Sequence, residues 1–162
     1  MIGETALDRL TARLDVGLAL RWAALPAALA GVGLSTYLSY TRIRGIPVYC
    51  EGAGDCHTVQ SSQYASLLGV PVAFLGLSLY AILAIVIALT LLRPLFLGEA
   101  GILAQFGLSL SGFLYSGYLT WLELYRIHAI CVWCVTSAAL LTFIFVLSAF
   151  TLFTREPPQQ LE

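Results

Sequence analysis

All four cysteines of this 162-residue chain fall into two close pairs. Cys50 and Cys56 flank the short polar stretch EGAGD, whereas Cys131 and Cys134 form a Cys-Val-Trp-Cys motif at the start of a long apolar run. Two thiols this close in sequence can form a disulfide, exchange it with another thiol, or bind a metal ion. The pairing therefore indicates redox or metal chemistry.

The two pairs differ in the backbone that is expected to carry them. Cys131 and Cys134 are spaced for the first turn of a helix, where unpaired backbone N–H groups and the helix dipole stabilise a thiolate. Cys50 and Cys56 are separated by five residues that include two glycines, so their Cα atoms can approach the roughly 5.5–6 Å of a disulfide. A mobile pair beside a fixed pair is the arrangement that a disulfide relay requires.

Two other interpretations of the cysteines remain open at this point. The chain could be a non-catalytic membrane scaffold with two structural disulfides, although bridging so short a loop adds little to a bundle held in lipid. The four thiolates could instead bind zinc. The loop spacing of five residues exceeds the usual two to four, and no second shell of polar side chains is evident. The redox relay accounts for both pairs together, and we predict it.

The composition of the remaining sequence is typical of a membrane protein. Apolar residues make up 59% of the chain and charged residues only 10%, against roughly 45–50% and about 25% in soluble domains. One small core cannot bury this surplus, so a lipid bilayer is the expected solvent. The net charge of -1 offers no basic surface for phosphates, which argues against a nucleic-acid partner.

Four apolar runs reach the length of roughly 20 residues that a membrane-spanning helix needs. They cover approximately 22–41, 70–92, 100–122 and 131–153. We therefore predict an all-α fold, an integral membrane four-helix bundle in which residues 1–162 form a single membrane domain. Residues 42–69 then form the one long loop, on the outer face.

The loop 42–69 contains a candidate lid between the first two spans. Its EGAGD stretch is too rich in glycine to form a helix or strand. Farther along, Ser61 or Ser62 can cap a short helix whose apolar residues Leu67 and Leu68 would lie on the bundle. Such a helix would cover the open end of the four spans.

The distribution of arginine predicts the orientation of the bundle. Four spans place both termini on one side of the membrane. The arginines on the side of the termini are Arg9, Arg13, Arg21, Arg93 and Arg155, and those on the other side are Arg42, Arg44 and Arg126. The positive-inside rule therefore predicts a multi-pass protein of the cell (inner) membrane with cytoplasmic termini. Both cysteine pairs then lie on the outer, oxidising face, where disulfides persist.

A thiol relay needs a final electron acceptor, and the sequence contains no flavin, haem or nucleotide motif. We expect neither a flavin nor a metal cofactor. A quinone dissolved in the lipid can reach a pocket in the bundle without leaving the membrane. Ser62 and Tyr64 are the candidate binding residues, because Ser62 can donate a hydrogen bond to a quinone oxygen. A plain helix cap is the alternative role for Ser62.

Three polar residues precede the Cys131 motif, and each can have a structural role at the membrane interface. Glu123 and Arg126 lie three residues apart and can form an ion pair at the membrane interface. For His128, proton delivery to the quinone is one hypothesis, and an interfacial position without a catalytic duty is the other.

The stretch from Cys56 to Tyr80 reads CHTVQSSQYASLLGVPVAFLGLSLY. Together with Cys50 and the motif Cys131–Cys134, it resembles bacterial members of the vitamin K epoxide reductase family. The similarity covers most of the chain, from the first span to the fourth. Its most specific parts are the separations of the four cysteines and the spacing of Ser62 and Tyr64 after Cys56.

The resemblance implies a membrane thiol oxidase that generates disulfide bonds together with a thioredoxin-like partner. By this resemblance, Cys134 faces a quinone of the ubiquinone or menaquinone type, and Cys131 exchanges disulfides with Cys56. Cys50 meets the thioredoxin-like partner, and Ser62 lies beside the quinone ring.

Two departures from the family pattern refine this expectation. Animal members hold vitamin K with an asparagine and a tyrosine, at positions where this chain has Val72 and Ala138. The resemblance therefore implies quinone reduction rather than epoxide reduction. Many bacterial relatives carry a fused thioredoxin-like domain, whereas only TREPPQQLE follows the fourth apolar run here. The expected partner is therefore a separate periplasmic or extracytoplasmic protein.

Overall fold

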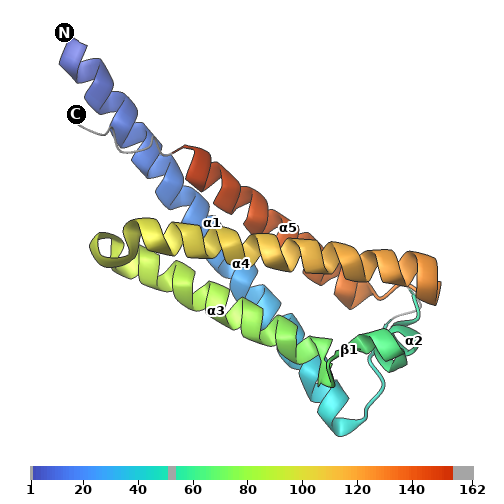
Figure 1. Cartoon of the computed structure of the whole chain (residues 1–162). Helices are drawn as coiled ribbons and strands as arrows, with labels where there is room; N and C mark the ends of the chain where they lie inside the picture. Colours follow the sequence, from blue (N-terminus) through green and yellow to red (C-terminus); the bar gives the residue numbers. More distant parts are fainter. Residues whose placement is uncertain (1, 51–53, 155–162) are drawn as a thin grey trace.

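The computed structural model describes residues 2–50 and 54–154 of the chain. Four long helices dominate it (Figure 1). Their bounds are α1 Ile2–Arg44, α3 Val72–Leu92, α4 Pro94–Leu122 and α5 Val132–Phe153. Most of the predicted EGAGD stretch and the tail that begins at Arg155 lie outside the described residues.

The four long helices pack in a closed cycle. α1 packs against α3 and α5, and α4 packs against the same two helices. The beginning of α1 and the end of α5 lie at one end of the bundle, and the short helix α2 (Cys56–Ser61) lies at the other (Figure 1). The segment between α1 and α3 is therefore placed beside the beginning of α5, where the second cysteine pair lies.

Helix ends follow from local chemistry. Pro71 precedes the first residue of α3, and Pro94 begins α4, positions where the missing proline N–H costs no helical hydrogen bond. Only Arg93 separates α3 from α4. These two helices consequently form a tight hairpin.

Three of the described helices are long and apolar enough to cross a membrane. They are the Asp15–Arg44 part of α1, α3 and α5. α4 is not among them, and it carries buried polar residues such as Gln105 and Ser109 on its inner face. The fourth span therefore stays a prediction, although α4 runs alongside two of the membrane-capable helices.

The core of the bundle centres on Tyr80, which is fully buried. Gly31 of α1 leaves space for its ring, because a Cβ atom at this position would overlap the ring. The Tyr80 hydroxyl donates to the carbonyl oxygen of Ser137 on α5, at 2.8 Å. This one side chain thus ties α3 to both α1 and α5.

Ser62 occupies the N-cap position of the short 3₁₀ helix η1 (Gln63–Ala65), as predicted, but its side chain makes no capping hydrogen bond there. The helix before it, α2, is capped by a different residue. α2 begins at Cys56, and Asp55 caps it: the Asp55 carboxylate accepts the backbone N–H of Thr58 at 3.0 Å and its hydroxyl at 2.6 Å. Ser61 is instead the last residue of α2, and Ser62 follows as its C-cap. The cap is Asp55 because its side chain reaches the free N–H groups of the first turn.

The predicted position on the bundle is confirmed for Leu67, which lines a cavity together with residues of the four long helices, and is wrong for Leu68. After α2 come a 3₁₀ turn, η1 (Gln63–Ala65), and a two-stranded antiparallel hairpin of β1 (Ser66–Leu67) and β2 (Val70–Pro71). Leu68 and Gly69 form the hairpin turn with positive φ angles of 51° and 85°. Leu68 therefore points outward with 98% of its surface exposed, instead of lying on the bundle.

Candidate redox site

The cysteine pair of α5 lies at the beginning of the helix, as its spacing predicts. Cys131 is the N-cap of α5, and its sulfur accepts the backbone N–H of Cys134 at 3.4 Å. Both residues are free thiols in the structure. A hydrogen bond with the Cys134 side chain lowers the pKa of Cys131, and burial of Cys131 opposes this effect. The geometry thus favours a thiolate at Cys131.

The loop pair forms a disulfide between Cys50 and Cys56, with Cα atoms 6.3 Å apart. Cys56 is the first residue of α2 and is buried in one cluster with Val59 and Cys131. Cys50 and Cys134 pack against this cluster. The structure therefore brings all four sulfur atoms to the same end of the bundle, although the two pairs are far apart in sequence.

Two hydrogen bonds fix the backbone next to Cys50. The carbonyl oxygen of Tyr49 accepts the indole N–H of Trp133 at 2.9 Å. The backbone N–H of Tyr49 donates to the Tyr37 hydroxyl at 3.3 Å. The rings of Tyr37 and Trp133 contact each other, with centroids 5.1 Å apart. Trp133, the third residue of the Cys131–Cys134 motif, therefore holds the loop pair beside its own helix.

The other end of the loop is fixed in a similar way. Asp55 donates its backbone N–H to the carbonyl oxygen of Ile130 at 3.1 Å. Gly54 precedes it with a φ of 113°, and a Cβ atom here would collide with the same Ile130 oxygen. The loop is thus anchored on both sides of residues 51–53 to the chain segment around Cys131.

Glu123 lies beside the thiols of α5. It begins a π-helical segment, η2 (Glu123–Ile127), which continues α4 and ends at His128 in the left-handed conformation. Such π-helical segments often occur at functional sites. Only 4% of the Glu123 surface is exposed, and its carboxylate accepts the backbone N–H of Cys131 at 3.0 Å. Burial raises the pKa of Glu123, and the hydrogen bond from Cys131 partly offsets this.

The predicted ion pair between Glu123 and Arg126 is not formed. Glu123 faces the protein interior, whereas Arg126 is exposed to solvent. Residues three apart share a face in an α-helix, but the wider turn of a π-helix separates them. His128 is exposed as well.

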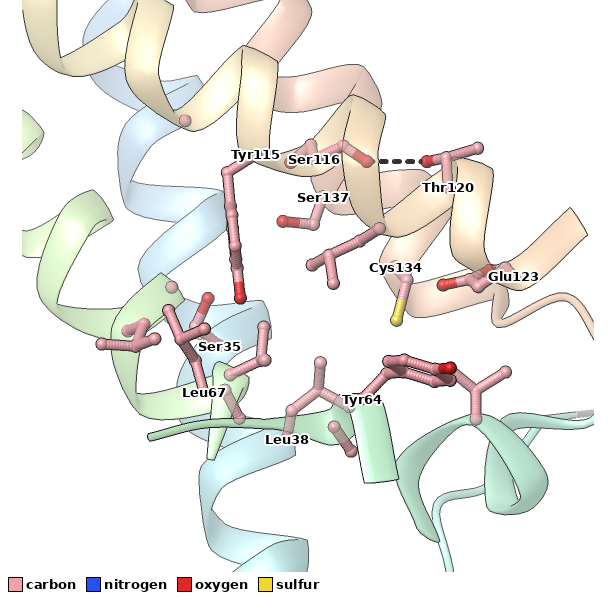
Figure 2. Close-up of a pocket in the computed structure, with 18 of the residues that line it drawn as sticks. Ser35, Leu38, Tyr64, Leu67, Tyr115, Ser116, Thr120, Glu123, Cys134 and Ser137 are labelled. Carbon is pink, nitrogen blue, oxygen red and sulfur yellow. Dashed lines mark hydrogen bonds between the residues drawn. The ribbon is translucent and has the colours of Figure 1, made fainter. Parts of the chain in front are cut away.

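A cavity of about 440 Å³ opens next to Cys134. Most of its wall is apolar, with contributions from all four long helices and η1. The polar or titratable side chains that line it are Ser35, Gln60, Ser62, Tyr64, Tyr80, Ser111, Tyr115, Ser116, Thr120, Glu123, Cys134 and Ser137. Figure 2 shows the Cys134 sulfur directed toward the Tyr64 ring, with Glu123 beside it.

The predicted quinone-binding residues lie on this cavity. Tyr64 and Ser62 both line it. The Ser62 hydroxyl donates its proton to the carbonyl oxygen of Val59 at 2.8 Å, so in this arrangement the predicted donation to a quinone oxygen is not available. Val72 also lines the cavity, and so does Ser137, the neighbour of Ala138. Quinone binding by these residues stays a prediction.

Two residues of the site have positions that their sequence context does not predict. The sequence assigns no role to Trp133 and predicts only an ion pair for Glu123. The available signal for Glu123 was a lone acidic residue between an apolar run and the Cys131 motif. Its burial depends on the π-helical segment, which no sequence period indicates. The contact of Trp133 with Tyr49 joins segments 84 residues apart.

Metal binding by the four cysteines does not match this geometry, because Cys50 and Cys56 are bonded to each other. Within the described residues, no group of three or more His, Cys, Asp or Glu side chains is arranged to hold a metal ion. A disulfide and a dithiol in one buried cluster are the two halves of a thiol–disulfide exchange.

Membrane-capable helices around a disulfide and a neighbouring dithiol define the class of protein: a multi-pass membrane protein with the groups for thiol–disulfide exchange. The sequence model of the vitamin K epoxide reductase family matches residues 22–149, most of the chain and both cysteine pairs. The chain belongs to the vitamin K epoxide reductase family. Members of this family are oxidoreductases that are generally associated with quinones and thioredoxin-like partners.

Proposed function

We propose that the chain is a quinone-dependent thiol oxidoreductase that generates disulfide bonds in a separate thioredoxin-like protein outside the cytoplasm. The observation that carries this proposal is the position of Cys134. It packs against the buried cysteine cluster and also lines the apolar cavity. A thiol in this position connects a protein disulfide with a lipid-soluble acceptor.

The cavity has the properties that a quinone requires. Its walls are mainly apolar, with a few polar groups, as in sites for flat organic ligands. Leu34, Leu38 and Leu79 would pack on the ring, and Tyr64 and Tyr115 offer hydroxyl groups to its oxygens. A bound quinone would supply a sink for two electrons and two protons.

Electrons enter the chain at Cys50. A partner thiolate attacks Cys50, the Cys50–Cys56 bond breaks, and Cys56 leaves as a thiolate. The second partner thiol then attacks the mixed disulfide, which releases the oxidised partner and leaves Cys50 reduced. Cys50 is suited to this role because it is only half-buried, whereas Cys56 lies inside the cluster.

The second exchange passes the electrons to α5. Cys56 attacks Cys131 of a Cys131–Cys134 disulfide, and Cys134 leaves as a thiolate. Cys50 then attacks Cys56, which restores the loop disulfide and releases Cys131. The result is an oxidised loop pair and a reduced helix pair, the combination present in the structure.

The proposal includes the placement of the protein in the inner membrane. α4 serves as the fourth span, since it packs along α3 and α5. The ends of the chain then lie in the cytoplasm, and both cysteine pairs lie at the outer surface. The short helix α2 and the hairpin β1–β2 cover the cavity from the outer side.

The test uses purified protein, a reduced thioredoxin-like protein and a soluble quinone, with quinone loss followed by absorbance. The parental protein should reduce the quinone, and Cys134→Ala should not. Val135→Ala, a change at the exposed neighbouring position, serves as the matched control. A Cys134→Ala protein that works at the parental rate contradicts the proposal. A zinc-containing protein whose disulfides do not exchange under mild reductant supports the scaffold alternative.

A further inference from the structure

A buried carboxylate lies next to the reacting thiols without a role in the exchanges described above. Glu123 is almost completely shielded from solvent, and burying an ionised carboxylate without a partner is costly. Its carboxylate accepts the backbone N–H of Cys131, and a further hydrogen bond joins it to the Cys134 side chain. The carboxylate therefore contacts the thiol that lines the cavity, and its two oxygens keep unused acceptor capacity.

The Cys134 thiol is close enough to Glu123 to share a proton with its carboxylate. Both side chains line the same cavity, and the carboxyl group lies beside the thiol in Figure 2. Electrostatic interaction links Glu123 to both thiols of the pair. A negative carboxylate and a negative thiolate this close repel each other, so one proton shared between them is favoured.

The other titratable groups around Glu123 do not replace it. These are Cys56 and His57 of α2, which packs against η2, and Cys131 and Cys134 of α5, joined to Glu123 by hydrogen bonds. The tyrosines near by are Tyr125 of η2 and the cavity-lining Tyr64, Tyr80 and Tyr115. Cys56 is held in a disulfide, and His57 is exposed. The charged group on the same segment, Arg126, is exposed as well. Glu123 is therefore the buried carboxyl group available to the dithiol among the described residues.

We propose that Glu123 accepts the proton of the Cys134 thiol when the dithiol is oxidised and passes it on to the reduced acceptor. This inference rests on the proposed function. In the step, the Cys131 thiolate and the Cys134 thiol form the disulfide, and Cys134 gives its S–H proton to the carboxylate. Two electrons pass to a quinone, which takes one proton from Glu123 and a second from water, giving a quinol. Glu123 ends as it began, ionised.

A purely structural role for Glu123 makes a different prediction. If the carboxylate only anchors the N–H of Cys131, a glutamine does the same, because its amide oxygen accepts the same hydrogen bond. The glutamine cannot take up a proton. Glu123→Gln therefore separates anchoring from proton transfer.

The first measurement does not involve the quinone. The reduced protein is treated with iodoacetamide over a range of pH, and modification of Cys134 is quantified by mass spectrometry. We expect Cys134 of Glu123→Gln to react at lower pH than the parental residue, because the negative charge that opposes its thiolate is gone. Glu99→Gln, a matched change at an exposed glutamate of α4, should leave the profile unchanged.

The second measurement is the single-turnover oxidation of the reduced pair by a soluble quinone. Glu123→Gln should slow it about 100-fold, the magnitude typical of a lost general base. Glu123→Asp keeps a carboxylate and should recover part of the rate, and it replaces the glutamine variant if that variant does not fold. Faster alkylation shows that the charge of Glu123 acts on Cys134, and slower oxidation of the same variant supports proton transfer, because a purely anchoring role is kept by glutamine and does not slow the oxidation.

The outcomes distinguish this inference from the proposed function. Parental protein that never reduces quinone overturns the proposed function and the step that rests on it, whatever the alkylation profile. Active parental protein together with Glu123→Gln that matches it in both measurements overturns the role of Glu123 alone.

Discussion

The two cysteine pairs lie in opposite surroundings. Cys50 and Cys56 are held by a loop whose fixed points are hydrogen bonds to other parts of the chain. Cys131 and Cys134 are held by the first turn of α5 itself, with a buried carboxylate beside them. One pair is thus positioned by tertiary contacts and the other by secondary structure.

This difference matches the two exchange partners that we propose. A protein partner needs an exposed sulfur on a segment that can adjust, which a short loop between two anchors provides. A small acceptor in the lipid needs a sulfur at a fixed place in a cavity, which a helix terminus provides. The comparison predicts that changes in the loop affect the partner reaction alone, whereas changes around α5 affect every reaction.

Replacing one cysteine of each pair should have the largest effects on quinone reduction. Cys134→Ala should lose quinone reduction with either a thioredoxin-like protein or dithiothreitol as reductant, by about 1000-fold or more, because the thiol that faces the acceptor is gone. Cys50→Ala should lose only the reaction with the protein, since a small dithiol can reach the inner pair without it. Both rates are measured from quinone absorbance.

The same two variants can also contradict the assignment of the loop pair to the protein partner and of the helix pair to the quinone. If Cys50→Ala lowers the rate of quinone reduction equally with both reductants, the loop pair is not a separate entry point for electrons from a protein partner. Ser78→Ala, which changes an exposed residue of α3 outside the cavity lining, controls for general effects on the bundle.

Gly54 tests the anchoring of the loop. Gly54→Ala adds a Cβ atom that collides with the Ile130 carbonyl at a backbone angle that alanine rarely adopts. Strain of this kind costs about 1–3 kcal/mol, so we expect the partner-driven rate to fall about tenfold. The dithiothreitol-driven rate should change little. Gly33→Ala is the matched control, since its Cβ would meet no atom within 4 Å.

Trp133 lies where the two regions meet, and its effect should be smaller. Trp133→Phe keeps an aromatic ring beside Tyr37 but removes the hydrogen bond to Tyr49. A bond of this kind contributes about 1 kcal/mol, so transfer from the loop pair to the helix pair should slow about fivefold. Rapid acid quenching and thiol counting would measure this transfer. An unchanged transfer rate with slower quinone reduction would instead place Trp133 in the cavity.

The sequence predicts the parts of the molecule that local chemistry determines. The apolar run that ends at Arg93 places the end of α3 correctly, and the spacing of Cys131 and Cys134 places them at a helix start. The predicted start at 100 is too late for α4, which begins at Pro94. The approach of the two pairs follows from the alternating direction of the helices. These features depend on neighbours in the sequence or on simple topology.

The remaining features depend on contacts that the sequence does not display. Asp55, Ser61 and Ser62 are all good caps, and the burial of Cys56 against Cys131 decides which of them begins the helix. The inward direction of Glu123 depends on one π-helical turn. Backbone irregularities of this kind have no periodic signal, although they position the chemistry.

The loop pair and the helix pair should also differ in how they respond to pH, and this effect should be the smallest. Hydrogen bonds from the Thr58 hydroxyl and backbone N–H lower the pKa of Asp55, the cap of the helix that carries Cys56. A lowered carboxyl pKa stabilises the folded helix above the ordinary value near 3.8, and this contribution is lost as the pH falls through the folded value. Hydrogen exchange at the Thr58 amide should therefore accelerate only in acid, and Asp55→Asn, which caps without charge, should remove this dependence.

The raised pKa of Glu123 acts in the opposite direction: its contribution to stability is lost as the pH rises above its ordinary value near 4.5. Acid should loosen the loop pair while it protonates the carboxylate beside the helix pair. Exchange that accelerates in both regions at the same pH would remove the distinction between them.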